Sequence, residues 1–163
     1  MKTLLILRHA KSSWKNPGLA DYDRPLNQRG KRDAPRMGQL LKKENLTPDA
    51  ILCSTAKRAR DTAEAIAETS GYEGEIEFKP EFYMGDPEAY RRALRGVSDD
   101  CQCVMVVGHN PGLEELVETL SGEAETMPTG ALAQVSLPIQ RWRQLADETK
   151  GKLINVWRPK ELN

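Results

Sequence analysis

Two short apolar runs, at residues 3–7 and 101–107, limit most strongly what this chain can fold into. A strand that buries only one face alternates apolar and polar residues, so a nearly unbroken apolar run indicates a strand covered on both faces. Around these runs, further strand-like segments alternate with segments of helical periodicity. This order predicts an α/β fold, in which a mostly parallel central sheet is flanked by helices on both faces, as in doubly wound sheets.

Residues that start or interrupt helices refine this prediction. Pro35 lies inside a helix expected after residue 27 and should kink or shorten it. Ser54 or Thr55 is expected to cap the next helix, and Asn110 to cap a later one with Pro111 in its first position. Further strands are expected at 50–53, at 75–79 on a sheet edge, at 131–137 and at 152–157, with a helix at 87–95 and a helix or loop at 141–148.

Length and charge bound the possible functions. The chain has 163 residues, which suits one domain over residues 1–163, and its 24 Lys plus Arg equal its 24 Asp plus Glu. A net charge of zero argues against non-specific nucleic-acid binding, which needs a basic excess. No apolar stretch approaches the ~20 residues that cross a bilayer, and the N-terminal one is too short for a signal peptide. We therefore expect a cytoplasmic monomer that binds neither nucleic acid nor membrane.

Three cysteines, an odd number, fit a reducing compartment. Cys101 and Cys103 suggest a metal site with His109. If residues 101–107 are extended, however, His109 lies about 26 Å from Cys101 at ~3.3 Å per residue. One ion cannot reach all three, so we interpret the cysteines as small core residues and expect no metal.

Both histidines of the chain, His9 and His109, directly follow an apolar strand. In sheets of this type, ligands bind beyond the carboxyl ends of the strands. A single His there is more often structural, but two at equivalent points favour a functional site. Arg8 precedes His9, and both side chains can reach one ligand only if the strand ends there.

Lys57 and Arg58 lie in the first turn of a helix, where the macrodipole favours anions by ~0.3–1 kcal/mol per charge. Lys57 could simply face solvent, but Arg58 is adjacent to the expected core face. An anion at this helix end would make the arrangement favourable. Two Arg and two His at one sheet edge suit a dianion such as phosphate. The chain lacks a P-loop, a Cys-x5-Arg loop and an Asp-rich metal site, which leaves histidine as nucleophile.

Four segments together resemble the histidine phosphatase (phosphoglycerate mutase-like) superfamily. The short chain and its Arg-His-Ala sequence are similar to the SixA-type phosphohistidine phosphatase branch. The likeness extends over the whole chain, and the four segments in this order are specific. They are LRHAKSSW at 7–14, DRPL at 23–26 with Arg-Gly at 29–30, STAKRARDTA at 54–63, and GHNPGLE at 108–114.

The resemblance implies that His9 attacks phosphorus and is transiently phosphorylated, while Arg8, Arg58 and His109 bind the phosphoryl oxygens. Water then releases phosphate, and no cofactor is needed. Arg24 would make a further phosphate or substrate contact.

The general acid is unassigned by the sequence. Many members of the superfamily have a Glu after the third strand, where this chain aligns ambiguously between Glu81 and Met84. Asp21 could orient the leaving group or the water, although a loop Asp is usually a turn residue. A phosphoramidate needs less help from an acid, since its leaving nitrogen is readily protonated.

Four functions are compatible with this pattern. We favour a phosphatase that acts on phosphohistidine in a protein, because short loops without a lid imply a shallow pocket. The alternatives are a phosphatase of small phosphorylated metabolites and a non-catalytic module that binds phosphorylated partners. A sugar-phosphate mutase is disfavoured because it needs a closed, dry site.

Overall fold

The two apolar runs form the middle of a six-stranded sheet. In the computed structural model, which describes residues 1–162, they become β1 (Lys2–Arg8) and β4 (Cys103–Gly108), paired in parallel. The strand order is β3-β2-β4-β1-β5-β6, with the first four strands parallel and the last two antiparallel to their neighbours. The other strands are β2 (Ala50–Ser54), β3 (Ile76–Lys79), β5 (Leu132–Leu137) and β6 (Lys152–Trp157).

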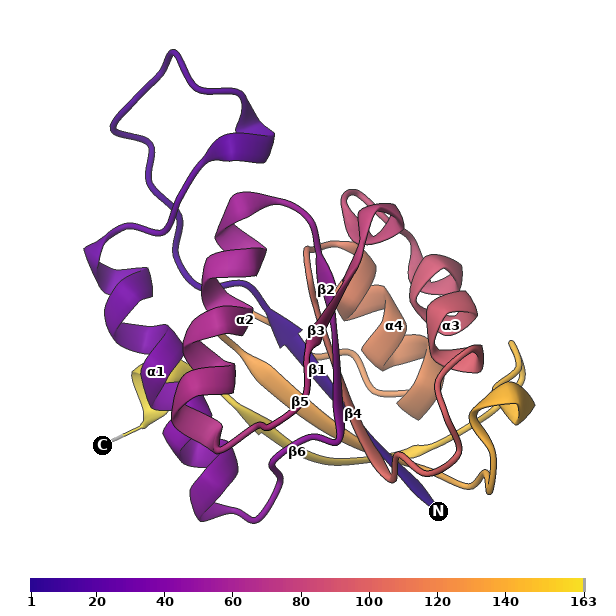
Figure 1. Cartoon of the computed structure of the whole chain (residues 1–163). Helices are drawn as coiled ribbons and strands as arrows, with labels where there is room; N and C mark the ends of the chain where they lie inside the picture. The colour runs from indigo at the N-terminus through magenta and orange to yellow at the C-terminus, as the bar shows by residue number, and fades with distance from the viewer. Residues whose placement is uncertain (163) are drawn as a thin grey trace.

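Helices cover both faces of this sheet, with α1 and α2 on one side and α3 and α4 on the other (Figure 1). Leu5 and Leu7 of β1 pack into the core beneath the first pair, and Leu4 and Ile6 into the core beneath the second. Both sides of β1 are therefore buried, which confirms the predicted fold class. The helices are α1 (Gln28–Lys43), α2 (Lys57–Ser70), α3 (Pro87–Arg95) and α4 (Gly112–Ser121).

Two predicted helix caps are wrong. Ala56 is the residue before α2, and the Ser54 hydroxyl accepts a hydrogen bond from its N–H without capping the helix. Pro111 occupies the cap position of α4, so that helix starts one residue later than predicted. Asn110 accepts a hydrogen bond from the backbone N–H of Glu114 at 3.3 Å. Each side chain also has a partner far away in the sequence, since Ser54 contacts His109 and Asn110 donates to the Met127 carbonyl.

Pro35 does not shorten the first helix, although shortening is one of the two effects predicted for it. α1 continues to Lys43 and buries Ala34, Met37 and Leu41 along its length. The packing of this face against α2 and the sheet compensates for the hydrogen bond that Pro35 cannot donate. Within residues 1–162, no helix is both long and apolar enough to cross a membrane.

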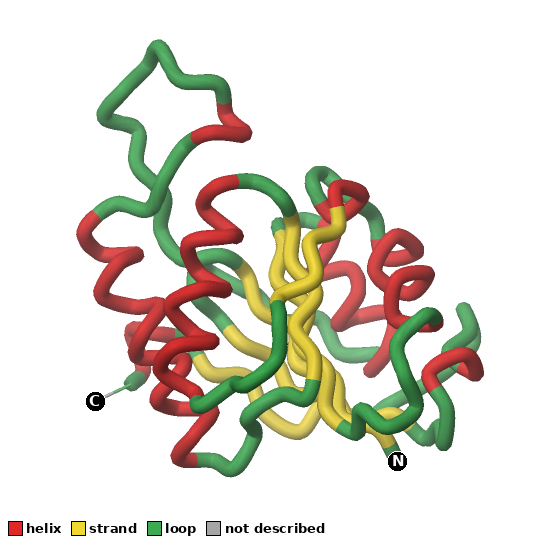
Figure 2. Tube along the Cα trace, viewed as in Figure 1, coloured by secondary structure: helices red, strands yellow, loops and turns green. Residues whose placement is uncertain are grey.

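A loop over residues 11–27 stands out from the carboxyl end of the sheet (Figure 2). Its two ends are joined by a bridge between Ser12 and Leu26, and the N–H of Asn27 donates to the carbonyl of Lys11 at 3.0 Å. Near its tip the short 3-10 helix Asp21–Asp23 turns the chain back. The loop is thus closed at its base, next to the start of α1.

We predict that Gly30→Ala destabilises the base of this loop. A Cβ atom at Gly30 would lie 2.2 Å from the Lys11 carbonyl oxygen, so one backbone segment has to move. The expected loss in the free energy of unfolding is about 1–3 kcal/mol, measured by urea denaturation. Gly96→Ala is the control, since its nearest contact would be an ordinary 3.6 Å. Equal stability of the two variants would contradict the prediction.

Candidate active site

Five basic side chains predicted from the sequence line one cavity of about 290 Å³ at the carboxyl end of the sheet. Arg8 lies opposite Gly108 in the parallel β1–β4 pair, so His9 and His109 leave neighbouring strands at the same level. Their ring centroids are 5.1 Å apart. The five are Arg8, His9, Arg24, Arg58 and His109.

His9 is held in one tautomer. Its Nδ1 lies 2.8 Å from the carbonyl oxygen of Ala10, and because a carbonyl can only accept, Nδ1 carries the hydrogen. The lone pair of the neutral ring is then on Nε2. The side chain is buried, which lowers its pKa to about 3, and the nearby positive charges act in the same direction. Near neutral pH the ring is therefore uncharged, and the lone pair of Nε2 is free.

His109 contacts a buried hydroxyl that the sequence did not identify. Its Nε2 lies 2.7 Å from Ser54 Oγ, which also accepts a hydrogen bond from Ala56 N–H. The other ring nitrogen, Nδ1, is buried and has no partner in the described chain. Burial lowers the pKa of His109 to about 4, so this ring is also neutral.

The anion expected at the start of α2 is a carboxylate of the chain itself. Arg58 donates to the backbone oxygen of Asp21 at 2.7 Å and to its carboxylate at 3.0 Å. Tyr83 donates its hydroxyl to the same carboxylate at 2.6 Å. This hydrogen bond, with those from Arg24 and Arg58, holds the pKa of Asp21 well below its usual range. Asp21 is therefore ionised and fixes the guanidinium of Arg58.

Arg24 is also fixed on several sides. It donates to the Asp21 carboxylate at 2.8 Å and to the Ser13 carbonyl at 3.0 Å, and the Trp14 ring lies 3.3 Å from its guanidinium carbon. Arg8 donates to the Met127 carbonyl at 3.1 Å, while its buried Nε has no partner in the described chain. Burial lowers the pKa of Arg8. Three guanidinium groups are thus preorganised around the histidines.

Comparison with known families identifies the family to which this chain belongs. Residues 4–86 match the model of the histidine phosphatase superfamily (branch 1), which covers more than half of the chain. The chain belongs to the histidine phosphatase superfamily. Membership of this superfamily supports phosphatase activity.

Relatives of this chain include an uncharacterised chloroplast protein of Arabidopsis thaliana. It is 34% identical over 137 residues, which are 78% of this chain and 63% of that protein, so the chain spans less than two thirds of this relative.

Two solved structures, both assigned as phosphohistidine phosphatase SixA, have the same fold. The Nakamurella multipartitia protein is 27% identical with a TM-score of 0.86, and the comparison covers 97% of this chain and 96% of the other. The Agrobacterium tumefaciens protein is 31% identical with a TM-score of 0.82, and the shares are 97% and 98%. These likenesses support the SixA-type branch.

The segment that left the general acid open places a different side chain next to the histidines. Glu81 and Met84 are exposed, and neither lines the cavity that contains His9 and His109, here called the catalytic cavity for its proposed role. Tyr83, between them, packs edge-on against His109 with ring centroids 5.6 Å apart. No sequence pattern marks Tyr83 as a site residue. Over residues 1–162, no group of three His, Cys, Asp or Glu side chains could hold a metal ion.

We predict that neither imidazole titrates near its ordinary pKa of 6.5 in the folded protein. NMR should show titration near pH 3 for His9 and near pH 4 for His109. In the unfolded chain both rings take up protons below about pH 6.5. The free energy of unfolding should therefore fall as the pH drops from about 6.5 to about 4, and His109→Gln should reduce that slope. Titration of either ring near pH 6.5 in the folded protein would contradict the prediction.

Proposed function

We propose that the protein hydrolyses phosphohistidine in a partner protein, through a phosphorylated His9 and without a metal ion or cofactor. The single observation that carries this proposal is the neutral His9 ring, fixed by Ala10 inside a cavity lined with cations. Such a ring needs no base to activate it, because its lone pair is already free. In this proposal, residues 1–163 form one catalytic domain that acts as a cytoplasmic monomer.

In the first step, Nε2 of His9 forms a bond to phosphorus while the P–N bond to the substrate breaks. The substrate imidazole takes the electron pair of that bond and departs neutral, with a proton taken from a water molecule, which becomes hydroxide. In the second step, the oxygen of another water molecule bonds to phosphorus and the P–Nε2 bond breaks. His9 regains its lone pair, phosphate is released, and one proton of the attacking water neutralises the hydroxide formed in the first step.

Arg8, Arg58 and His109 would stabilise the equatorial phosphoryl oxygens, where charge spreads in the transition state. In this proposal Ser54 donates its hydroxyl to Nε2 of His109, so that Nδ1–H of His109 and Nε–H of Arg8, which have no partner in the described chain, are available to the phosphoryl oxygens. Arg24 would contact the phosphoryl group or the substrate beside it. Asp21 would act as a positioning residue, since its carboxylate is already shared by Arg24, Arg58 and Tyr83.

The lining of the catalytic cavity favours a nitrogen-linked phosphoryl group. Among the described residues, those that line it include neither Asp nor Glu. An alkyl phosphate ester needs an acid to protonate its leaving alkoxide, whereas an imidazole leaves readily once protonated by water. A cavity without a carboxylic acid therefore suits phosphohistidine better than a sugar phosphate.

The proposal is tested by comparing kcat/KM for a phosphohistidine peptide and for a panel of sugar phosphates, with and without EDTA. We expect a clear preference for the peptide and no effect of EDTA. A preference for the sugar phosphates would identify a phosphatase of small metabolites. Binding of the peptide without turnover would identify a non-catalytic module, and loss of activity in EDTA would overturn metal independence.

A further inference from the structure

A second cavity, here called the loop groove, adjoins the catalytic cavity. It has a volume of about 790 Å³ and lies between residues 11–15 of the protruding loop and residues 25–31 at the start of α1. Lys11, Ser12 and Trp14 line both the loop groove and the catalytic cavity. The two cavities therefore share part of their walls, and Trp14 belongs to both.

The loop groove is positively charged. Lys11, Lys15, Arg29 and Lys31 line it, and among the described residues its lining includes no Asp or Glu. Arg29 is paired within α1, but over residues 1–162 no ion pair involves any of the three lysines. The first turn of α1 also has no acidic residue, so the positive end of that helix adds to the charge. Because the whole chain has a net charge of zero, this excess is local.

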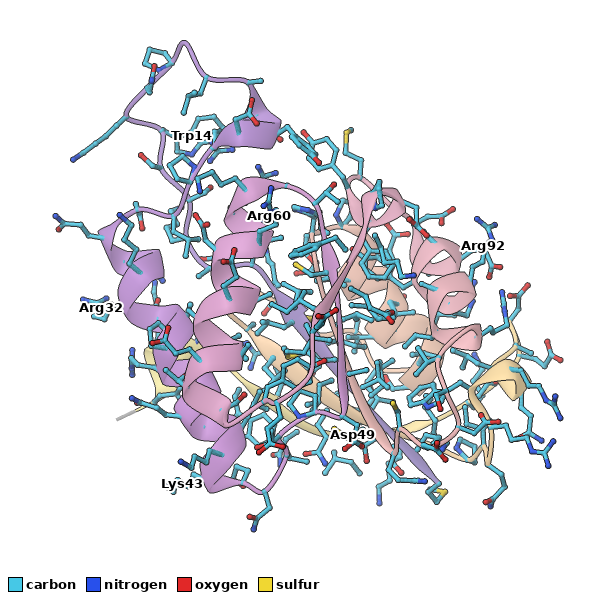
Figure 3. The ribbon with its side chains drawn as sticks, in the orientation of Figure 1. Trp14, Arg32, Lys43, Asp49, Arg60 and Arg92 are labelled. Carbon is cyan, nitrogen blue, oxygen red and sulfur yellow. The ribbon has the colours of Figure 1, made fainter. Side chains whose placement is uncertain are left out.

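The ring of Trp14, which lines both cavities, is a rigid apolar surface. Its side chain is 73% exposed, yet it stacks on the guanidinium of Arg24, which is buried and hydrogen-bonded. Exposed aromatic side chains that are already ordered are typical of binding surfaces, since little entropy is lost on contact. Figure 3 shows Trp14 on the protruding loop, far from Lys43 at the other end of α1.

We propose that the loop groove binds an acidic segment of the same partner protein that presents its phosphohistidine to His9. This inference rests on the proposed function. A phosphohistidine side chain needs only the smaller cavity, whereas the loop groove has room for several residues. Carboxylates complement its lysines, and the apolar parts of the segment pack on Trp14. Nucleic acid is disfavoured, because single-strand binding uses successive aromatic platforms, whereas Trp14 is the one aromatic residue among the described residues that line the groove.

The test uses two phosphohistidine peptides of equal length, one with Glu and the other with Gln at the positions flanking the phosphorylated residue. For the native enzyme we expect kcat/KM to be about tenfold higher for the Glu peptide at low salt, with the preference shrinking as salt is added. The double variant Lys15→Gln/Lys31→Gln should reduce this preference to about twofold or less. The double variant Lys43→Gln/Arg92→Gln, which removes two exposed cations remote from the groove, should keep it.

The outcomes separate this inference from the function on which it rests. Equal kcat/KM for the two peptides would overturn the acidic-segment inference while leaving the proposed function in place. A preference that persists in the Lys15 and Lys31 variant would overturn the role of the groove. Turnover of an aryl phosphate but of neither peptide would overturn the proposed substrate and this inference with it. Stronger inhibition by single-stranded RNA than by the unphosphorylated Glu peptide would assign the groove to nucleic acid instead.

Discussion

Replacing His9 by Ala is expected to lower kcat by at least about 10³-fold, for an aryl phosphate and for a phosphohistidine peptide alike. The reason is that the covalent route disappears, since the side chain that receives the phosphoryl group is absent. Steady-state kinetics measure the loss. Intact-protein mass spectrometry after an alkaline quench tests its cause, because the native enzyme should gain the mass of one phosphoryl group and the variant should not.

His109→Gln is the matched control for this experiment, because it changes the other imidazole of the same cavity and leaves the nucleophile in place. We expect it to slow turnover while the phosphoenzyme still forms. The reverse result, with a phosphoenzyme in His9→Ala and none in His109→Gln, would assign the covalent role to His109. Thermal denaturation of both variants shows whether either loss comes from unfolding.

The second large effect is expected for Arg58→Ala, which should lower kcat by about 100-fold or more. A buried guanidinium that is already fixed by Asp21 can contact the developing charge without reorganisation, and Ala supplies no donor. The effect is measured as kcat for the aryl phosphate, because the leaving group of this substrate needs the least help from an acid.

Arg60→Ala provides the control on the same helix. Arg60 is exposed, and its guanidinium lies over the ring of Phe78 on β3, outside the catalytic cavity (Figure 3). This variant should keep kcat within about twofold of the native value. Equal losses for the two substitutions would mean that general charge, and no specific contact of Arg58, supports activity.

The sequence predicts the centre of the cavity because elementary geometry links its parts. An apolar run that is followed by His defines both a buried strand and the place where it ends, and parallel strands bring such ends together. His9 and His109 meet for this reason. The unfavourable cations at the start of α2 likewise indicate an anion nearby, although only the structure identifies the Asp21 carboxylate as a partner of Arg58.

Other contacts leave no trace in the local sequence. Tyr83 and Asp21 are 62 residues apart in the chain, and their hydrogen bond depends on how the protruding loop and the segment after β3 meet. Ser54 has the position of a typical helix cap, but its hydroxyl contacts His109, 55 residues away. In each case a tertiary contact competes with the local interaction that a pattern can predict.

The closed base of the protruding loop lies between the part of the molecule that positions the histidines and the part that lines the proposed binding groove. The backbone ladder between neighbouring strands sets the spacing of His9 and His109, whereas residues 11–15 of the loop line the proposed binding groove. Exchanges between residues 15 and 20 could thus alter which molecules are accepted, provided that Asp21 and Arg24 of the same loop keep their contacts with the groups below. Proteins with this architecture can therefore change what they bind by changing one loop of the chain.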